Sequence, residues 1–163
     1  MRLCVVCAEQ GRSCCVNRDI VVSSGDVERI TSHTGSSDFH ELRPARSPEY
    51  LEQDDDPLWN LCTVQLCGRR KVLRHAAPGI CWFLGERGCR LPEEIRPLVC
   101  RLHPVEFNAE RLTGLSPECP GEHLPPGENV LVNLNMDLGR AEKWRQQLYE
   151  ELRRELQHRP KAA

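Results

Sequence analysis

Hydrophobic residues recur at helical spacing toward the end of the chain. They occupy Leu134, Leu138, Ala141, Leu148, Leu152 and Leu156. Residues three, four or seven positions apart share one side of an α-helix, so this pattern predicts an amphipathic helix over about residues 135–157. Its apolar face most simply packs against the rest of the protein; the alternative is that it docks a protein partner.

Upstream of this helix the hydrophobic pattern breaks into short pieces. The run DIVVSS at residues 19–24 favours a short strand. Ser24 then offers an N-cap to a helix over about residues 25–33. Thr34 and Gly35 end that helix, because glycine accommodates the left-handed backbone at a helix C-terminus.

Two longer stretches carry weaker patterns. Residues 35–57 are polar, interrupted by proline and without a clear period, which predicts a long surface segment. In residues 58–75 the apolar positions alternate only in part. A strand pair is slightly favoured over a helix there.

The segment GICWFLGERGCRL at residues 79–91 is typical of a β-hairpin. Its arms are apolar, and Gly85 to Gly88 can form the turn. Such a hairpin would bring Cys81 and Cys89 toward each other across its arms.

The residues after this hairpin alternate between helix and turn signals. A helix can begin at residues 92–94, where proline precedes two acids, and Pro97 interrupts it. This leaves a constrained segment around Cys100, and SPECPG at 116–121 is a turn that holds Cys119. These elements predict an α+β fold, a small domain of short strands, a hairpin and helices, followed by the C-terminal amphipathic helix.

Composition narrows the class of protein. The chain has 163 residues, which favours one domain, and only 5% are aromatic while 28% are charged, so the apolar core should be modest. The net charge of -2 gives no basic footprint for nucleic acid. No apolar run approaches the ~18 residues of a membrane span, and the first residues lack the apolar run of a signal peptide. We therefore expect a cytoplasmic protein that binds neither nucleic acid nor membrane.

Cysteine is the residue type that most distinguishes this sequence. The chain has 10, and four of them fall within CVVCAEQGRSCC at residues 4–15. Cys4 and Cys7 have the C-x-x-C spacing at which a tight turn can aim two thiolates at one ion, a spacing shared by redox dithiols and iron–sulfur ligand pairs. Cys14 and Cys15 cannot easily bond each other, because adjacent Cα atoms lie only ~3.8 Å apart. In an extended chain they would point to opposite sides, so more than one metal site or a multinuclear site is considered.

Several chemistries could use so many thiols. In a reducing compartment a dense cysteine pattern favours metal or redox chemistry over disulfides. A disulfide framework and a core filled with small apolar cysteines stay open as alternatives. A thioredoxin-like dithiol is expected beside a βαβ pattern, and none precedes Cys4 and Cys7.

Several short motifs also follow one another in the order seen in a known family. They are the C-x-x-C followed by the CC pair, Asp19-Ile20-Val21, Asp26 with Arg29-Ile30, Gly79-Ile80-Cys81-x-Phe83-Leu84, Gly88-Cys89, Arg96-Pro97-x-x-Cys100-Arg101, Pro104 and Cys119-Pro120-Gly121. In this combination, which spans residues 4 to about 121, the chain resembles the YkgJ-like family of cysteine-cluster proteins described as zinc- or iron-chelating. Two positions depart from the family pattern: six residues separate Cys7 from Cys14, where the family usually has fewer, and His103 stands where an aromatic residue is commoner.

The resemblance implies metal chelation by the cysteines that fall within it. They are Cys4, Cys7, Cys14, Cys15, Cys81, Cys89, Cys100 and Cys119. A related cysteine cluster in a flagellin lysine methylase implies an iron–sulfur centre. All-sulfur ligation suits iron–sulfur clusters and zinc alike, and eight thiolates exceed what one tetrahedral zinc can use. Two zinc ions would use eight thiolates equally well, so an iron–sulfur cluster is only slightly favoured over zinc.

Other candidate residues have simpler interpretations. Cys62 and Cys67 lie outside the family pattern and are expected to be ordinary buried cysteines. His103 could complete a Cys/His site, but a packing or surface role is favoured. The carboxylate run at residues 54–56 is expected to be a solvated loop.

Two arginines have two interpretations of equal weight. Arg96 and Arg101 are either surface charges or the cations that offset the negative charge of metal-bound thiolates.

The leading hypothesis is a cytoplasmic metal-binding protein that holds an iron–sulfur cluster or zinc. Residues 1–125 would form the cysteine-cluster metal-binding domain, a small metal-organised domain, and residues 126–163 the helix that packs on it or docks a partner. Because no nucleophile–base pair or phosphate-binding loop stands out, the sequence leaves open whether the protein is an enzyme. The alternatives are a thiol–disulfide oxidoreductase using Cys4 and Cys7, or a structural zinc module that recruits a partner.

Overall fold

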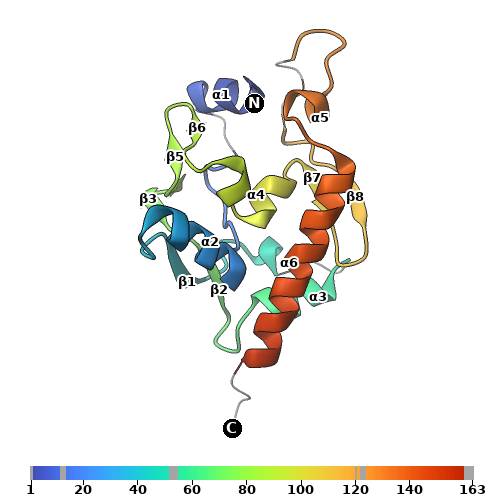
Figure 1. Ribbon diagram of the computed structural model, residues 1–163. Coiled ribbons are helices and arrows are strands. Elements are labelled where there is room, and N and C mark those ends of the chain that lie inside the picture. Colours follow the sequence, from blue (N-terminus) through green and yellow to red (C-terminus); the bar gives the residue numbers. More distant parts are fainter. Residues whose placement is uncertain (1, 12–13, 52–54, 120, 122–123, 160–163) are drawn as a thin grey trace.

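The computed structural model describes residues 2–11, 14–51, 55–119, 121 and 124–159 (Figure 1). In chain order the elements are α1 (Arg2–Glu9), α2 (Ser24–Thr34), β1 (His40–Pro44), the 3-10 helix η1 (Pro48–Tyr50), α3 (Pro57–Thr63), β2 (Arg69–Leu73), β3 (His75–Ala77), β4 (Ile80–Cys81), β5 (Leu84–Gly85), β6 (Gly88–Cys89), the 3-10 helix η2 (Glu93–Ile95), α4 (Leu98–Leu102), β7 (Val105–Phe107), β8 (Leu112–Leu115), α5 (Val130–Asn133) and α6 (Leu138–His158). Helices and short strands thus alternate before one long C-terminal helix, and the predicted α+β class is confirmed.

The strands are paired two by two rather than joined in one large sheet. Within the described residues they form four antiparallel pairs, β1–β2, β3–β4, β5–β6 and β7–β8. The longest pair sets His40 opposite Leu73 and Pro44 opposite Arg69. Residues 19–24, predicted as a strand, contribute only a single bridge from Val21 to β2.

The helix predicted at residues 25–33 is confirmed as α2, with its N-cap one residue earlier than expected. The Ser23 hydroxyl accepts from the Asp26 N–H, and the Asp26 carboxylate accepts from the Ser23 N–H. This reciprocal pair is a capping box, which satisfies two backbone donors that helix geometry leaves without partners. Gly35 ends the helix as predicted, with a φ of 72°.

Two sequence interpretations are wrong in part. Within residues 58–75, where a strand pair was slightly favoured, α3 forms first, because the Asp56 side chain caps it and Pro57 occupies its first turn. Only the second half is a strand, β2. The expected long surface segment at 35–57 contains β1 and η1, because β1 finds a partner in β2.

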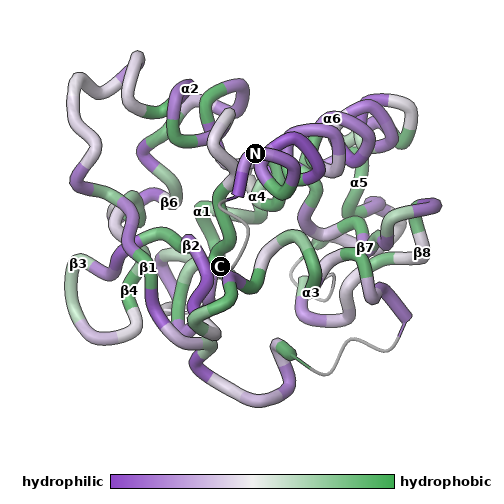
Figure 2. The backbone as a smooth tube through the Cα atoms, turned by 90° about the horizontal axis from the view of Figure 1, so that it is seen from below, coloured by the Kyte–Doolittle hydropathy of each residue, from purple (hydrophilic) through white to green (hydrophobic). Residues whose placement is uncertain are grey.

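The C-terminal helix packs on the domain through its apolar face. α6 begins after the N-cap Asp137, and Ala141, Leu148 and Leu152 are buried, whereas Leu138 is exposed. These residues join Trp59, Leu98 and Leu102 from α3 and α4 in the larger hydrophobic cluster. In Figure 2 α6 is mostly hydrophilic in colour, because only one stripe of it faces the core.

A second hydrophobic cluster lies on the other side of α4. It is formed by Ile20, Val22, Ile30, Phe39, Leu73, Cys81, Phe83 and Leu91. In Figure 1 α1 lies at the top of the molecule next to the β5–β6 hairpin, with α5 at the same end. In the described part of the chain, every helix is too short or too polar to cross a membrane.

Candidate metal centre

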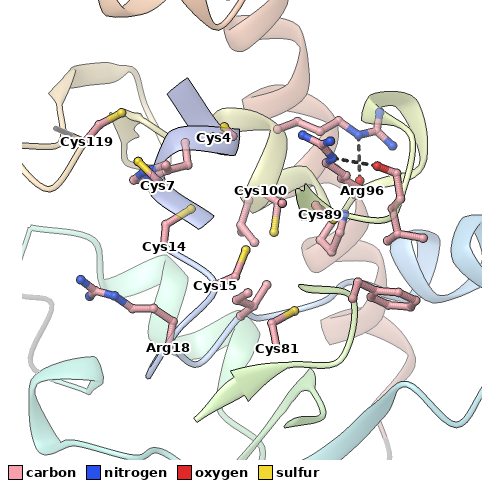
Figure 3. A pocket seen from close by; sticks show the side chains of 18 of the residues that line it. Cys4, Cys7, Cys14, Cys15, Arg18, Cys81, Cys89, Arg96, Cys100 and Cys119 are labelled. Atoms are coloured by element: carbon pink, nitrogen blue, oxygen red, sulfur yellow. Dashed lines mark hydrogen bonds between the residues drawn. The ribbon is translucent and has the colours of Figure 1, made fainter. Parts of the chain in front are cut away.

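A partly open cavity of about 590 Å³ lies between α1, α4 and the β5–β6 hairpin. All the cysteines of the family-like pattern line it (Figure 3): Cys4, Cys7, Cys14, Cys15, Cys81, Cys89, Cys100 and Cys119. The structure therefore brings together every predicted site residue, from segments that are far apart in the sequence.

The two remaining cysteines do not line this cavity. Cys62 is only 1% exposed and packs in the larger hydrophobic cluster, as expected for an ordinary buried cysteine. Cys67 is exposed, so the expectation of burial is wrong for it. It sits in the turn before β2, where the Gly68 N–H donates to the Gln65 carbonyl.

The C-x-x-C pair lies on a helix rather than in a tight turn. Cys4 and Cys7 are three residues apart in α1, so their side chains share one face of that helix. α1 is held by the buried Leu3, whose N–H donates to the Asn133 side chain at 3.1 Å. On its other side Gly88 lies against the Cys4 backbone, and with a φ of 97° it needs the conformational freedom of glycine.

The predicted hairpin at residues 79–91 is present but shorter. β5 and β6 pair Leu84 with Cys89, whereas Cys81 pairs with His75 of β3. Cys81 and Cys89 are thus not opposite one another in a strand pair, although both side chains line the cavity.

The CC pair lies at the middle of the cysteine cluster. The Cys81 N–H donates to the Cys15 carbonyl at 3.0 Å. A hydrogen bond with the Cys15 side chain, together with burial, raises the pKa of the Cys81 thiol. A hydrogen bond with Cys15 and burial likewise raise the pKa of Cys14. Residues 14 and 15 form a turn, so the opposed arrangement expected for an extended chain does not apply to them.

Cys100 is positioned by the short helix α4. Its N–H donates to the Pro97 carbonyl at 2.9 Å, and the helix starts at Leu98, directly after Pro97. Burial raises the pKa of the Cys100 thiol well above its ordinary value. Burial also raises the pKa of the Cys4 and Cys89 thiols. In the protein without metal, the raised pKa values of Cys4, Cys14, Cys81, Cys89 and Cys100 therefore favour their neutral thiols.

One of the two predicted arginines acts on the thiols electrostatically. The positive charge of Arg96 lowers the pKa of Cys4, Cys89 and Cys100, against the larger effect of burial. Arg101 lines the cavity but is largely buried, and its guanidinium donates to the backbone carbonyls of Glu94 and Arg96. Arg96 is thus the residue suited to offset thiolate charge.

His103 lies between this cavity and a second one of about 420 Å³. Burial lowers the pKa of His103, which favours the neutral imidazole. The second cavity is also lined by Asp56, which is buried because it caps α3 and accepts a hydrogen bond from the Tyr149 hydroxyl. The expectation of a solvated loop is wrong for Asp56, and Asp54 lies outside the described residues.

Sequence reasoning missed one ion pair at the rim of the cavity. Arg18, three residues after Cys15, pairs with Glu118, the neighbour of Cys119. The pair ties the turn that holds Cys119 to the segment that follows the CC pair. The only sequence signal is that each partner lies close to a cysteine and that their charges are opposite.

The sulfurs converge without forming a finished coordination shell. The ten cysteines are thiols rather than disulfides, so the disulfide framework is not seen. Among the residues that the structure describes, no group of three or more His, Cys, Asp or Glu side chains could hold a metal ion as it stands. A metal would displace the thiol protons and draw the sulfurs closer, as is usual where binding is coupled to folding.

Comparisons of this chain with models of known protein families, with curated proteins and with solved structures find no match.

Proposed function

We propose that this protein binds metal through the eight cysteines of the cavity, as an iron–sulfur cluster or as zinc, with the cluster slightly favoured. The observation that carries the proposal is the selection of cysteines: those of the family-like pattern line one cavity, and Cys62 and Cys67 do not. Six separate segments supply them, namely α1, residues 14–15, β4, β6, α4 and the turn before residue 119. A core filled merely with small apolar residues gives no reason for this convergence.

The chemistry of the donors fits the proposed metals. Thiolates are soft ligands that select zinc and iron–sulfur clusters. A single zinc with sulfurs at about 2.3 Å needs far less room than this cavity of about 590 Å³ offers. A multinuclear metal centre, or more than one metal centre, fits that space better. Arg96 would offset part of the negative charge of the thiolates.

The oxidoreductase alternative has less support. A redox-active C-x-x-C thiol normally has a lowered pKa, because the thiolate is the nucleophile. Burial raises the pKa of Cys4 instead. The compartment and a protein partner also belong to the proposal. A reducing compartment such as the cytoplasm suits a cluster of thiols. A protein partner would contact surfaces other than the face of α6 that packs in the core.

The decisive experiment is metal and sulfide analysis of protein purified without oxygen. An iron–sulfur protein should be brown, with broad absorption near ~400 nm and acid-labile sulfide. Stoichiometric zinc without sulfide would show that the bound metal is zinc rather than an iron–sulfur cluster. Protein that contains neither iron nor zinc would overturn the proposal. Cys89→Ser and Cys100→Ser should lower the metal content, whereas the matched controls Cys62→Ser and Cys67→Ser should leave it unchanged.

A further inference from the structure

We propose that the eight thiols form two separate metal centres that differ in accessibility. Cys15, Cys81, Cys89 and Cys100 form the inner quartet, and Cys4, Cys7, Cys14 and Cys119 form the outer quartet. The inner centre retains its metal while the outer one exchanges it with solution. This inference rests on the proposed function and concerns how that site is divided.

The first support is the relation of each thiol to the hydrophobic core. All four inner cysteines belong to the second hydrophobic cluster: Cys81 is 4% exposed, and the other three pack against the cluster from its edge. The outer cysteines belong to neither cluster of the described residues. The inner thiols thus pack against the apolar side chains of this cluster, and the outer thiols do not.

The second support is the positions of the side chains in the cavity. Figure 3 shows Cys15, Cys81, Cys89 and Cys100 on one side. It shows Cys7, Cys14 and Cys119 on the other side, and Cys4 above and between the two groups. We assign Cys4 to the outer quartet because it shares helix α1 with Cys7. The hydrogen bond between the Cys14 and Cys15 side chains joins the two groups, so the two centres would be close neighbours.

The third support is the anchoring of the segments that carry the ligands. Three of the inner ligands come from β4, β6 and α4, near the buried Phe83, Leu91 and Leu98. The fourth, Cys15, comes from the same turn as the outer Cys14 but packs against the second hydrophobic cluster. The other three outer ligands come from the short helix α1 and from a surface turn in which the Cys119 N–H donates to the Ser116 carbonyl at 3.3 Å. Segments with few buried apolar residues open at a much smaller free-energy cost than the core does. The outer centre should therefore release its metal first.

Zinc alone is the probe that tests this division, whichever metal the protein holds in the cell. Metal-free, reduced full-length protein is loaded with zinc under nitrogen, and an excess of a chromophoric chelator is then added. We expect two zinc ions per chain, released in two phases whose rates differ by about tenfold or more, because local openings span a wide range of free energies. Single-phase release, or one zinc per chain, would overturn the division.

Serine variants assign the phases. Cys119→Ser and Cys7→Ser should abolish the rapidly released zinc and keep the slowly released zinc. Cys81→Ser should abolish the slowly released zinc. Cys67→Ser, an exposed cysteine outside the cavity, is the matched control and should keep both. If Cys81→Ser does not fold, as judged by circular dichroism, the two outer variants still decide: loss of the slow zinc in either contradicts the division. Protein that binds no zinc at all contradicts the proposed function itself, whereas zinc bound without this partition contradicts only the two centres.

Discussion

The carboxylate of Asp26 accepts a hydrogen bond of 3.0 Å from the backbone N–H of Leu98, although the two residues are 72 positions apart. Leu98 is the first residue of α4, and its N-cap Pro97 supplies no capping side chain. Asp26 therefore caps two helices, its own and α4. Because α4 carries Cys100, this buried carboxylate positions one wall of the cysteine cavity.

Asp26→Ala should lower the free energy of unfolding by about 3 kcal/mol, since buried backbone donors and the guanidinium of Arg29 lose a charged acceptor. Asp26→Asn should cost less, because burial raises the pKa of Asp26 and so disfavours the charged form that Asn lacks. Urea denaturation of both variants measures this. Glu28→Ala on the exposed side of the same helix is the control and should change stability little; equal losses at the two positions would contradict the capping role.

Tyr149→Phe should destabilise the protein by about 1–3 kcal/mol, because it leaves the buried Asp56 carboxylate without the phenol that donates to it. The pair joins the middle of α6 to the N-terminus of α3. A double-mutant cycle with Asp56→Asn measures the coupling by thermal or urea unfolding. Additive effects of the two changes would mean that the hydroxyl contributes nothing through Asp56.

Arg96→Gln should weaken zinc binding by roughly tenfold, the scale of one lost interaction with a charged group. The reason is that the Arg96 charge lowers the pKa of Cys4, Cys89 and Cys100 and so favours their thiolates. Competition with a chelator gives the affinity. Arg87→Gln removes the same charge from the exposed turn of the neighbouring hairpin, and its affinity should stay that of the wild type.

Zinc affinity should keep rising with pH beyond the range in which ordinary thiols have already ionised. Hydrogen bonding or burial raises the pKa of Cys14, Cys81 and Cys100, so these thiols still hold protons above the ordinary value of about 8.5. Each thiol that binds zinc gives up its proton, so affinity falls as pH falls. Chelator competition from neutral to alkaline pH checks the sign and the range. A plateau reached near pH ~8.5 would mean that the thiols are not protected by burial.

Removing bound metal under reducing conditions should loosen residues 4–121, because binding in such sites is coupled to folding. Amide hydrogen exchange should increase most in α1 and in the β5–β6 hairpin. The middle of α6 serves as an internal control, since its buried face packs on α3 and α4. Cooperative melting that is unchanged in verified metal-free protein would show that the metal does not organise the fold.

Local signals in the sequence are sufficient to predict those elements that depend on residues close together in the chain. The ends of α2 and the apolar stripe of α6 follow from capping residues and helical spacing. β1 could not be found in this way, because its sequence HELRP has no alternation and it is held by β2, a partner distant in sequence. The exposure of Cys67 depends on the turn at Gly68, whose φ is 73°.

The same contrast holds for the cavity. The order of motifs was sufficient to select its cysteines, yet it did not reveal that Cys4 and Cys7 share a helix or that Cys81 pairs with β3. The proposed division into two quartets depends on which thiols pack against the second hydrophobic cluster, and such contacts are set by the folded chain as a whole.

Cys4 and Cys119 line the same cavity, although they stand near opposite ends of the cysteine-bearing region. During synthesis the ribosome therefore releases the first thiols long before the last one. Until the turn at Cys119 has left the exit tunnel, the cavity has no complete wall, and the early cysteines are open to oxidants and to stray ions. On the proposed function, metal loading is therefore a late step, which follows the release of Cys119 from the ribosome.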